Sequence, residues 1–423
     1  MKTTCLIHLA CVAMIATATA QAPEPTATFE GVVVLNASDL LPAALLHGPS
    51  YRVRDQVGTD GFMAHFEIDS DFGFFEAVGV PQAKRRIVEV EAIRKLVETS
   101  KSDLFAEGLK RSIEQPIDAV KNIVKNPVAS VKQAPKTVGH FFSKIGSSIE
   151  RGVDKIKDSA SDDGADATAG DVGKGIGNTA KNVVGFDKAK LETAKQLGVD
   201  PYSDNARLQE EMDKVTWAFF AGGLPLRIGA AAASAGLALA ATNMVGIPDD
   251  TYALTQSELA LRDEDGLRSM GVSATDIKAF QIQSALSVTR RHRIVNTLLA
   301  LPNANGRGLV VRLANDCTSP AQADFLIGAL AILAERQRSG AADYVSLKVL
   351  GRLPGATTAS GELNVPAPVD HVTWTEEVAG FAQRDDLGTA PKVLVHTGHL
   401  SPATTTGLTA AAWKIVAVPY PER

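Results

Sequence analysis

The sequence predicts a helix-rich α+β protein with a small N-terminal antiparallel sheet, central amphipathic and Ala/Gly-rich helices, and a C-terminal α/β domain. Residues 62–68 alternate between apolar and polar side chains, which is typical of a strand with one buried face. In the central region the apolar residues recur at helical spacing instead. After residue 250, helical patterns alternate with short strand-like runs, which indicates an α/β arrangement.

The chain is long enough for several folded parts, because about 400 residues exceed what one hydrophobic core usually serves. The expected parts are a signal peptide (1–20), a small sheet plus helix (21–112), amphipathic repeat helices (113–158), a flexible linker (159–177), a helical region with an apolar Ala/Gly-rich helix (178–250) and a C-terminal α/β domain (251–423).

The first twenty residues fit a secretory signal peptide. Lys2 supplies the positive start, an apolar stretch follows, and Ala18-Thr19-Ala20 forms a small-residue cleavage site. A lipoprotein anchored at Cys11 is the alternative, but His8 stands where that signal requires an aliphatic residue. The apolar run is shorter than the roughly 20 residues that span a bilayer. We therefore expect a periplasmic or secreted protein, released or associated with a membrane only at its surface.

Charge and cysteine content exclude several classes of protein. After cleavage, 42 basic residues face 48 acidic ones, a net charge of −6, which argues against a nucleic-acid partner. Cys317 is then the one remaining cysteine, so no intrachain disulfide can form. Residues 101–157, in contrast, carry eleven basic and six acidic side chains, so this stretch is locally positive.

The N-terminal part predicts strands at residues 29–35, 51–57 and 62–68, followed by a helix at 82–109. Glu67, Asp69 and Asp71 alternate along one strand and offer carboxylate oxygens to a cation. A solvated polar face explains them equally well.

Residues 115–158 divide into four blocks of eleven residues. An eleven-residue repeat gives about 3.67 residues per turn, so its apolar stripe runs nearly straight along the helix and suits a flat surface. Flanking lysines can reach anionic headgroups. The residues expected to contact a membrane or a partner are Ile117, Val120, Lys121, Val131, Lys132, Phe141, Phe142, Ile149 and Val153.

This repeat resembles the lipid-surface helices of apolipoproteins, perilipins and synucleins, and the resemblance covers about a tenth of the chain. It implies contact with an anionic lipid surface. Those families lack proline inside the repeat, whereas Pro116, Pro127 and Pro135 each interrupt a helix here. We expect short helical pieces, and packing on the protein's own core or on an envelope protein remains the alternative.

The small, acidic and Gly-rich residues 159–177 predict the linker. Residues 191–218 have helical spacing interrupted at 198–202, with Asp204 or Asn205 capping the second helix. The Ala/Gly-rich run 228–245 predicts a buried helix or helical hairpin, with insertion into a bilayer as the alternative.

In the C-terminal part, helices are expected at 257–270, 273–301 and 320–337, with Ser273 or Thr275 and Ser319 as caps. Strands are expected at 309–313, 345–350, 392–395 and 415–418.

One loop in this part offers chemistry. His396 and His399 follow the strand at 392–395, and open α/β sheets bind ligands at the carboxyl ends of their strands. Two imidazoles three residues apart can bind a metal if Asp370 or His371 supplies a further ligand. The simpler interpretation is that both histidines cap a helix or meet solvent.

Two further groups have simple structural interpretations. Cys317 follows a predicted strand and is a possible nucleophile, although a free cysteine more often fills a buried apolar site. Residues 290–293 form a basic cluster on a helix, which we expect to be exposed.

The stretch Leu197-Gly198-Val199-Asp200-Pro201-Tyr202 and the closing Gly-rich α/β unit are similar to uncharacterised exported proteins of proteobacteria. This resemblance implies an exported location and no particular activity.

Together these observations predict a non-enzymatic, envelope-associated binding protein without a cofactor, which contacts an anionic membrane surface or an envelope protein through its repeat. The alternative is a periplasmic hydrolase or metal-binding enzyme that uses the loop of His396 and His399.

Overall fold

The computed structural model describes residues 29–114, 185–226, 228 and 246–421. In these residues the chain forms a helix-rich α+β fold with an antiparallel N-terminal sheet and a mixed C-terminal sheet, which confirms the predicted fold class. Residues 115–184 lie outside the described residues, and with them the repeat, its contact residues from Ile117 to Val153 and the expected linker. So does most of the Ala/Gly-rich run at 228–245.

The N-terminal sheet is antiparallel, with the order β1-β4-β5-β3-β2, and β6 pairs with β5. Its strands are β1 (Val34–Asn36), β2 (His47–Gly48), β3 (Tyr51–Val53), β4 (Gln56–Thr59), β5 (Ala64–Ser70) and β6 (Gly73–Val78). Short helical turns α1 (Ala37–Leu40) and η1 (Ala43–Leu45) join β1 to β2. Ala64, Phe66 and Ile68 are buried, which confirms the predicted alternation from Ala64 onward, whereas Phe62 is exposed and precedes the strand. On the polar side Arg54 pairs with Glu67 and Asp69 at the surface.

Helix α2 (Val80–Thr99) joins two hydrophobic cores. Ile87 and Val90 pack on the N-terminal sheet, and Ile93 and Leu96 pack against helix α6 (Ala206–Ala221). The helix expected at 82–109 is interrupted after α2, and α3 (Asp103–Glu114) follows as a separate helix. Residues 185–197 are also helical, and the Asn205 side chain caps α6 by accepting a hydrogen bond from the Leu208 N–H, as predicted.

A group of helices precedes the C-terminal sheet: η4 (Asp249–Tyr252), α8 (Gln256–Ser269), α9 (Ala274–Ile282), α10 (Val288–Leu299), α11 (Arg307–Asn315) and α12 (Pro320–Arg338). Ser273 and Ser319 cap α9 and α12, as predicted. The helix expected at 273–301 is two helices, α9 and α10.

The strand predicted at 309–313 is wrong, because these residues lie in helix α11. Val310, Val311 and Ala314 are buried in one core, which is helical spacing, and Gly306 takes a positive φ of 85° just before the helix. A short apolar run fits either a strand or a buried helix, and here the packing decides.

The C-terminal sheet has the order β13-β11-β9-β8-β7. Its strands are β7 (Tyr344–Leu350), β8 (Leu353–Thr358), β9 (Leu363–Ala367), β11 (Lys392–His396) and β13 (Trp413–Ala417). Strands β9, β11 and β13 are parallel, whereas β7 and β8 are antiparallel to their neighbours. The strands expected at 345–350, 392–395 and 415–418 are thereby confirmed, while β8 and β9 were not predicted.

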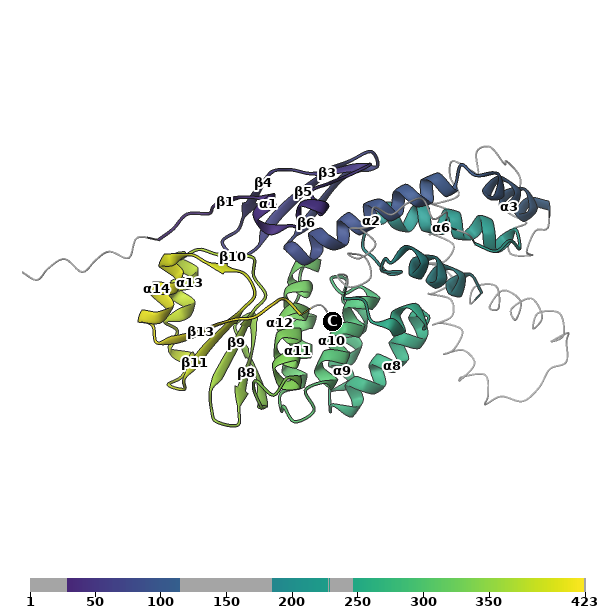
Figure 1. The fold of residues 1–423 in the computed structure, drawn as a ribbon. Coiled ribbons are helices and arrows are strands. Elements are labelled where there is room, and N and C mark those ends of the chain that lie inside the picture. The colour runs from purple at the N-terminus through teal and green to yellow at the C-terminus, as the bar shows by residue number, and fades with distance from the viewer. Residues whose placement is uncertain (1–28, 115–184, 227, 229–245, 422–423) are drawn as a thin grey trace, which may run out of the picture.

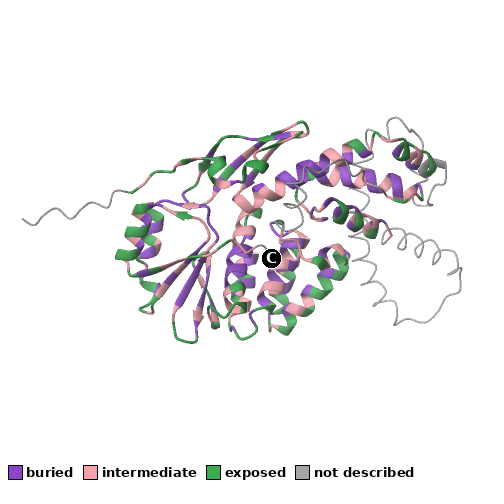
Figure 2. Ribbon diagram, viewed as in Figure 1, coloured by how far each residue is buried: buried purple, intermediate pink, exposed green. Residues whose placement is uncertain are grey.

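Helices cover both faces of this sheet. On one face Ile332 of α12 packs on Val393 and Val395 of β11. On the other face α13 (Glu376–Ala382) and α14 (Pro402–Ala410) pack on β9, β11 and β13. Figure 1 shows this arrangement, with the N-terminal sheet above the C-terminal one, and Figure 2 shows buried residues along the strands and exposed ones on the outer sides of α13 and α14.

A short segment joins the N-terminal and C-terminal sheets. The backbone N–H groups of Asp370 and His371 donate to the Phe62 carbonyl, and β10 (His371–Val372) pairs in parallel with β12 (His399–Leu400). The N-terminal sheet is therefore joined to the segment that follows β9 of the C-terminal sheet. Among the described helices, none combines the length and apolar character that a membrane span requires.

Candidate functional site

A crevice lies at the carboxyl ends of the three parallel strands. The segments that follow β9, β11 and β13 line it with Asp370, Thr397 to His399 and Tyr420, and its volume is about 350 Å³. The first turns of α2 add Lys84 and Arg85, and α10 adds Arg293. Open α/β sheets place ligands in this position, and the volume is within the usual range for small ligands, about 300 to 1,000 Å³.

The histidine loop predicted from the sequence borders this crevice. The His396 ring is buried and its Nδ1 lies 2.8 Å from the Gly398 carbonyl oxygen, whereas His399 is exposed. His371 pairs with His399 across the two short strands, so the sheet brings together the histidines named from the sequence. Burial lowers the pKa of His396 and that of His371, and the nearby His399 lowers both further.

These residues do not form a metal site in the structure. No group of three or more His, Cys, Asp or Glu side chains that could hold a metal ion occurs among the described residues. The Asp370 carboxylate accepts from the backbone N–H groups of Ala64 at 2.9 Å and Val80 at 3.2 Å, and so fastens the start of α2 to the end of β9. Burial raises the pKa of Asp370 to about 6.

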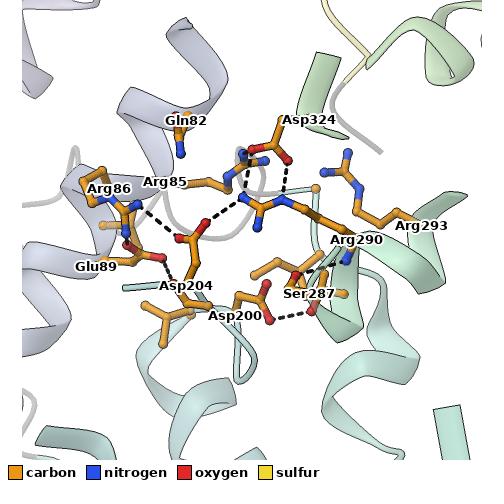
Figure 3. A pocket seen from close by; sticks show the side chains of 17 residues that line it. Gln82, Arg85, Arg86, Glu89, Asp200, Asp204, Ser287, Arg290, Arg293 and Asp324 are labelled. Carbon is orange, nitrogen blue, oxygen red and sulfur yellow. Dashed lines mark hydrogen bonds and ion pairs between the residues drawn. The ribbon is translucent and has the colours of Figure 1, made fainter. Parts of the chain in front are cut away.

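Next to the crevice a chain of ion pairs joins α2, the loop before α6, α10 and α12 (Figure 3). Glu89, Arg86, Asp204, Arg290, Asp324 and Arg85 follow one another in alternating charge, at distances of 2.6 to 3.1 Å. Three carboxylates thus face three guanidinium groups. The space among them is about 40 Å³, too small for a ligand larger than a few waters.

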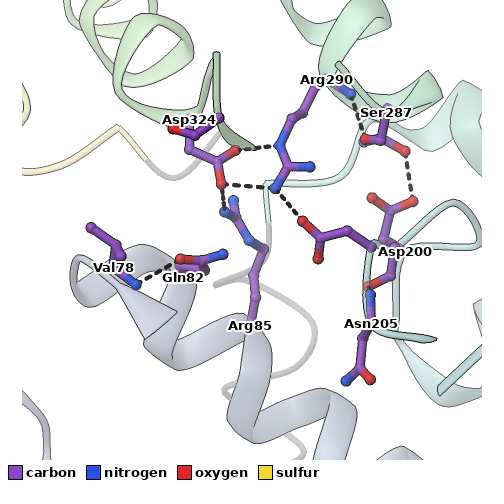
Figure 4. Close-up of polar contacts among 12 residues, drawn as sticks. Val78, Gln82, Arg85, Asp200, Asn205, Ser287, Arg290 and Asp324 are labelled. Atoms are coloured by element: carbon purple, nitrogen blue, oxygen red, sulfur yellow. Dashed lines mark hydrogen bonds and ion pairs between the residues drawn. The ribbon is translucent and has the colours of Figure 1, made fainter. Parts of the chain in front are cut away.

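Asp324 is the branch point of this network. Figure 4 shows its carboxylate between Arg85 and Arg290. The basic cluster expected to be exposed is therefore wrong in part, because Arg290 is buried in the network and the His292 ring is fully buried beside Asp263. The carboxylate partners stand on other elements, so the sequence pattern of the helix alone could not show them.

Arg293 differs from its neighbours in the cluster. Arg293 lines both the small space of the network and the crevice, and no dashed line reaches it in Figure 3. Among the described residues no carboxylate pairs with it. Burial lowers the pKa of Arg293.

A second, much larger cavity of about 1380 Å³ opens where β8 and β9 diverge. The ladder between them is short: Thr357 faces Leu363, and Ala356 faces Asn364. Continuing this register would place Pro354 opposite Pro366, and neither proline has an N–H to donate. The pairing between β8 and β9 accordingly ends at Ala356 and Asn364.

The interior of this cavity is mainly apolar. Its walls include Phe325 and Leu326 of α12, Val365 of β9, Leu394 of β11, Phe381 of α13 and Trp413 of β13. The charged lining residues, in contrast, are exposed: Asp60, Arg312, Asp316, Arg352 and Glu377. A mostly apolar lining with a few polar groups is typical of small-molecule binding sites.

Cys317 lines this cavity and follows helix α11, so its predicted position after a strand is wrong. Its Sγ lies 3.7 Å from the Leu313 carbonyl, and burial raises the pKa of the thiol to about 11. The thiolate is the reactive form, so a thiol with a raised pKa is a poor nucleophile. We therefore interpret Cys317 as a lining residue of the cavity.

Sequence reasoning identified the histidine loop but neither cavity as a whole. The crevice needs Lys84, Arg85 and Arg293, which lie on two separate helices. The cavity is lined by residues of several separate elements, among them α11, α12, β9, β11 and α13. Comparison with family models, with curated proteins and with solved structures gives no match.

Proposed function

We propose that this chain is an exported, non-enzymatic binding protein that holds a lipid acyl chain in the cavity between β8 and β9. The observation that carries the proposal is the lining of that cavity, whose walls are apolar and whose charged side chains stand at the exposed mouth. An acyl chain buries its methylenes in the interior, with about 0.8 kcal/mol gained for each CH₂ removed from water. Its polar head stays at the mouth.

The size of the cavity supports a ligand of this kind. Its volume of about 1380 Å³ exceeds the roughly 300 to 1,000 Å³ of most small-molecule sites. Residues from α11, α12, the hairpin tip, β9, β11 and α13 surround it, so a long flexible chain would be contacted on several sides. A flat apolar face would instead favour a protein partner.

The sequence supplies a source of such a ligand. The signal peptide predicted at residues 1–20 supports an envelope location, and the lysine-flanked repeat at 115–158 has the pattern of a lipid-surface helix. We therefore propose that the repeat contacts an anionic membrane surface and that the cavity receives a single chain from it.

The direct test is a titration of the chain beginning at Gln21 with cis-parinaric acid, followed by displacement with palmitate. Ala321 stands on the first turn of α12 and lines the cavity, so Ala321→Trp places an indole inside it. We expect binding by the unaltered protein and at least a tenfold loss in this variant. Ala410→Trp, on the exposed side of α14, is the matched control and should bind normally.

Two results would refute the proposal. One is the absence of saturable binding to the unaltered protein. The other is equal binding by the Ala321→Trp and Ala410→Trp variants, because the fatty acid would then occupy some other surface.

A further inference from the structure

The crevice at the carboxyl ends of β9, β11 and β13 has more cationic groups than its own carboxylates neutralise. Lys84, Arg85 and Arg293 line it, together with Asp39 and Asp370. Arg85 is paired with Asp324 at 2.7 Å, but neither Lys84 nor Arg293 forms an ion pair with another described residue. Within the described residues Lys84 and Arg293 therefore have no carboxylate in direct contact, although the charges of Asp324 and Asp200 act on Arg293 from a greater distance.

Neither acidic residue of the crevice is placed to fill that role. Both oxygens of Asp370 accept from backbone N–H groups, of Ala64 and of Val80. Asp39 is exposed and accepts from the Asn36 side chain at 3.0 Å. Gly246 also lines the crevice and brings no charged side chain to it.

The crevice also offers neutral donors. The Gly398 N–H forms no hydrogen bond with the described residues, and neither does the Tyr420 hydroxyl. Glycine is required at position 398 because a Cβ there would lie 2.3 Å from the Val369 and Asp370 carbonyl oxygens. Gly398 itself lines the crevice, so this close approach places the loop backbone on its wall.

A partly buried guanidinium without a partner costs free energy, because burial removes water from a charged group. Guanidinium, ammonium, hydroxyl and backbone N–H groups are all donors, and this set matches the oxygens of a phosphate or a carboxylate. We propose that the crevice binds a small oxyanion, with Arg293 and Lys84 as its principal contacts and the Gly398 N–H and Tyr420 hydroxyl as further donors.

The proposal is independent of the acyl-chain cavity, although Val369 lines both spaces. Inorganic phosphate is the first probe, titrated by calorimetry into the chain beginning at Gln21 at pH 7 and constant ionic strength. Acetate and sulfate, titrated in the same way, distinguish a carboxylate site from a site for tetrahedral oxyanions. We expect saturable binding of at least one of the three.

Lys84→Met is the most informative variant, because Lys84 has no described ion pair to lose and folding should be unaffected. We expect at least a tenfold weaker affinity for the anion in Lys84→Met and in Arg293→Met. The matched controls are Lys95→Met on the same helix as Lys84 and Arg291→Met on the same helix as Arg293, since neither residue lines the crevice. Both controls should keep the affinity of the unaltered protein.

The proposal fails if none of the three anions binds, or if Lys84→Met binds as tightly as Lys95→Met. It also fails if Arg293→Met is more stable than the unaltered protein while the anions leave the unfolding midpoint of both unchanged. Arg293 would then be a structural side chain without a ligand.

Discussion

The Arg290 guanidinium holds both carboxyl oxygens of Asp324, with its Nε 3.0 Å from Oδ1 and its Nη2 3.0 Å from Oδ2. The same carboxylate accepts from Arg85 at 2.7 Å. Asp324 therefore links α12, the helix that packs on the C-terminal sheet, to both α10 and α2. Removing its charge would leave two partly buried guanidinium groups without full compensation.

Asp324→Asn is accordingly expected to lower the free energy of unfolding by about 3 to 5 kcal/mol, the usual result of breaking a buried ion pair from one side. Urea unfolding followed by circular dichroism measures it. Glu335→Gln is the control on the same helix, where the carboxylate pairs with Arg338 at the surface, and its cost should be under about 1 kcal/mol. Equal costs for the two variants would show that the network contributes no more than a surface pair.

Asp200 should make stability depend on pH. Its carboxylate accepts from the Thr289 hydroxyl at 2.6 Å and the Tyr202 N–H at 2.8 Å, and burial raises its pKa to about 6. Because the folded-state pKa exceeds the unfolded value near 3.8, the folded protein binds this proton more tightly. This group therefore costs stability as pH rises from about 4 to 6, by about 3 kcal/mol in total.

Asp200→Asn removes this cost while retaining an oxygen acceptor for both hydrogen bonds. The variant should be more stable than the unaltered protein at pH 7, and the difference should shrink towards pH 4. Urea unfolding at several pH values measures the difference directly, so that all other titrating groups cancel. A difference that is constant with pH, or that grows towards pH 4, would contradict the assignment.

Gly398 fixes the loop that borders the crevice. Gly398→Ala would place a Cβ 2.3 Å from two backbone carbonyl oxygens, so the loop must move, and we expect a loss of about 2 kcal/mol or more. Gly380 on α13 has open space at the same position, and Gly380→Ala should be neutral or stabilising by up to about 1 kcal/mol. Thermal unfolding of the two variants makes the comparison, and a neutral Gly398→Ala would show that the contact is not close.

The fold class was predictable because it follows from patterns among residues that are close together in the sequence. The alternation around Phe66 and the caps at Ser273 and Ser319 depend on neighbours in the sequence. The strand β9 was not predicted because Pro366 is a strand breaker locally, yet here it stands where the ladder ends. The crevice was not predictable in the same way. Arg290 and Arg293 lie on one helix, and they differ only because Asp204 and Asp324, on other elements, pair with Arg290.

Cys317 should react slowly with thiol reagents in the folded protein. With its pKa raised to about 11, its thiolate fraction at pH 8 is roughly 100-fold lower than that of an ordinary cysteine. The chain beginning at Gln21 contains no other cysteine, so maleimide labelling in buffer and in urea reports this residue alone. If an acyl chain fills the cavity, palmitate should slow the folded-state labelling further. Labelling at the same rate in buffer and in urea would contradict the burial.

The repeat at 115–158 should bind an anionic membrane surface. Because of its apolar positions and flanking lysines, we expect the chain beginning at Gln21 to sediment with vesicles that contain an anionic phospholipid at low salt. High salt should release it, because salt screens the attraction between the lysines and the headgroups. Changing Val120, Val131, Phe142 and Val153 to Asp should lower the bound fraction at least tenfold.

The matched control changes Val32, Leu261 and Ile282 to Asp, since these are exposed apolar residues outside the repeat. It tests whether any loss of surface apolar side chains has the same effect. Sedimentation of the control but not of the repeat variant would assign membrane contact to the repeat. If the unaltered protein stays in solution at both salt concentrations, the repeat does not bind lipid, and palmitate binding by the cavity would then have to proceed without a membrane-contacting segment.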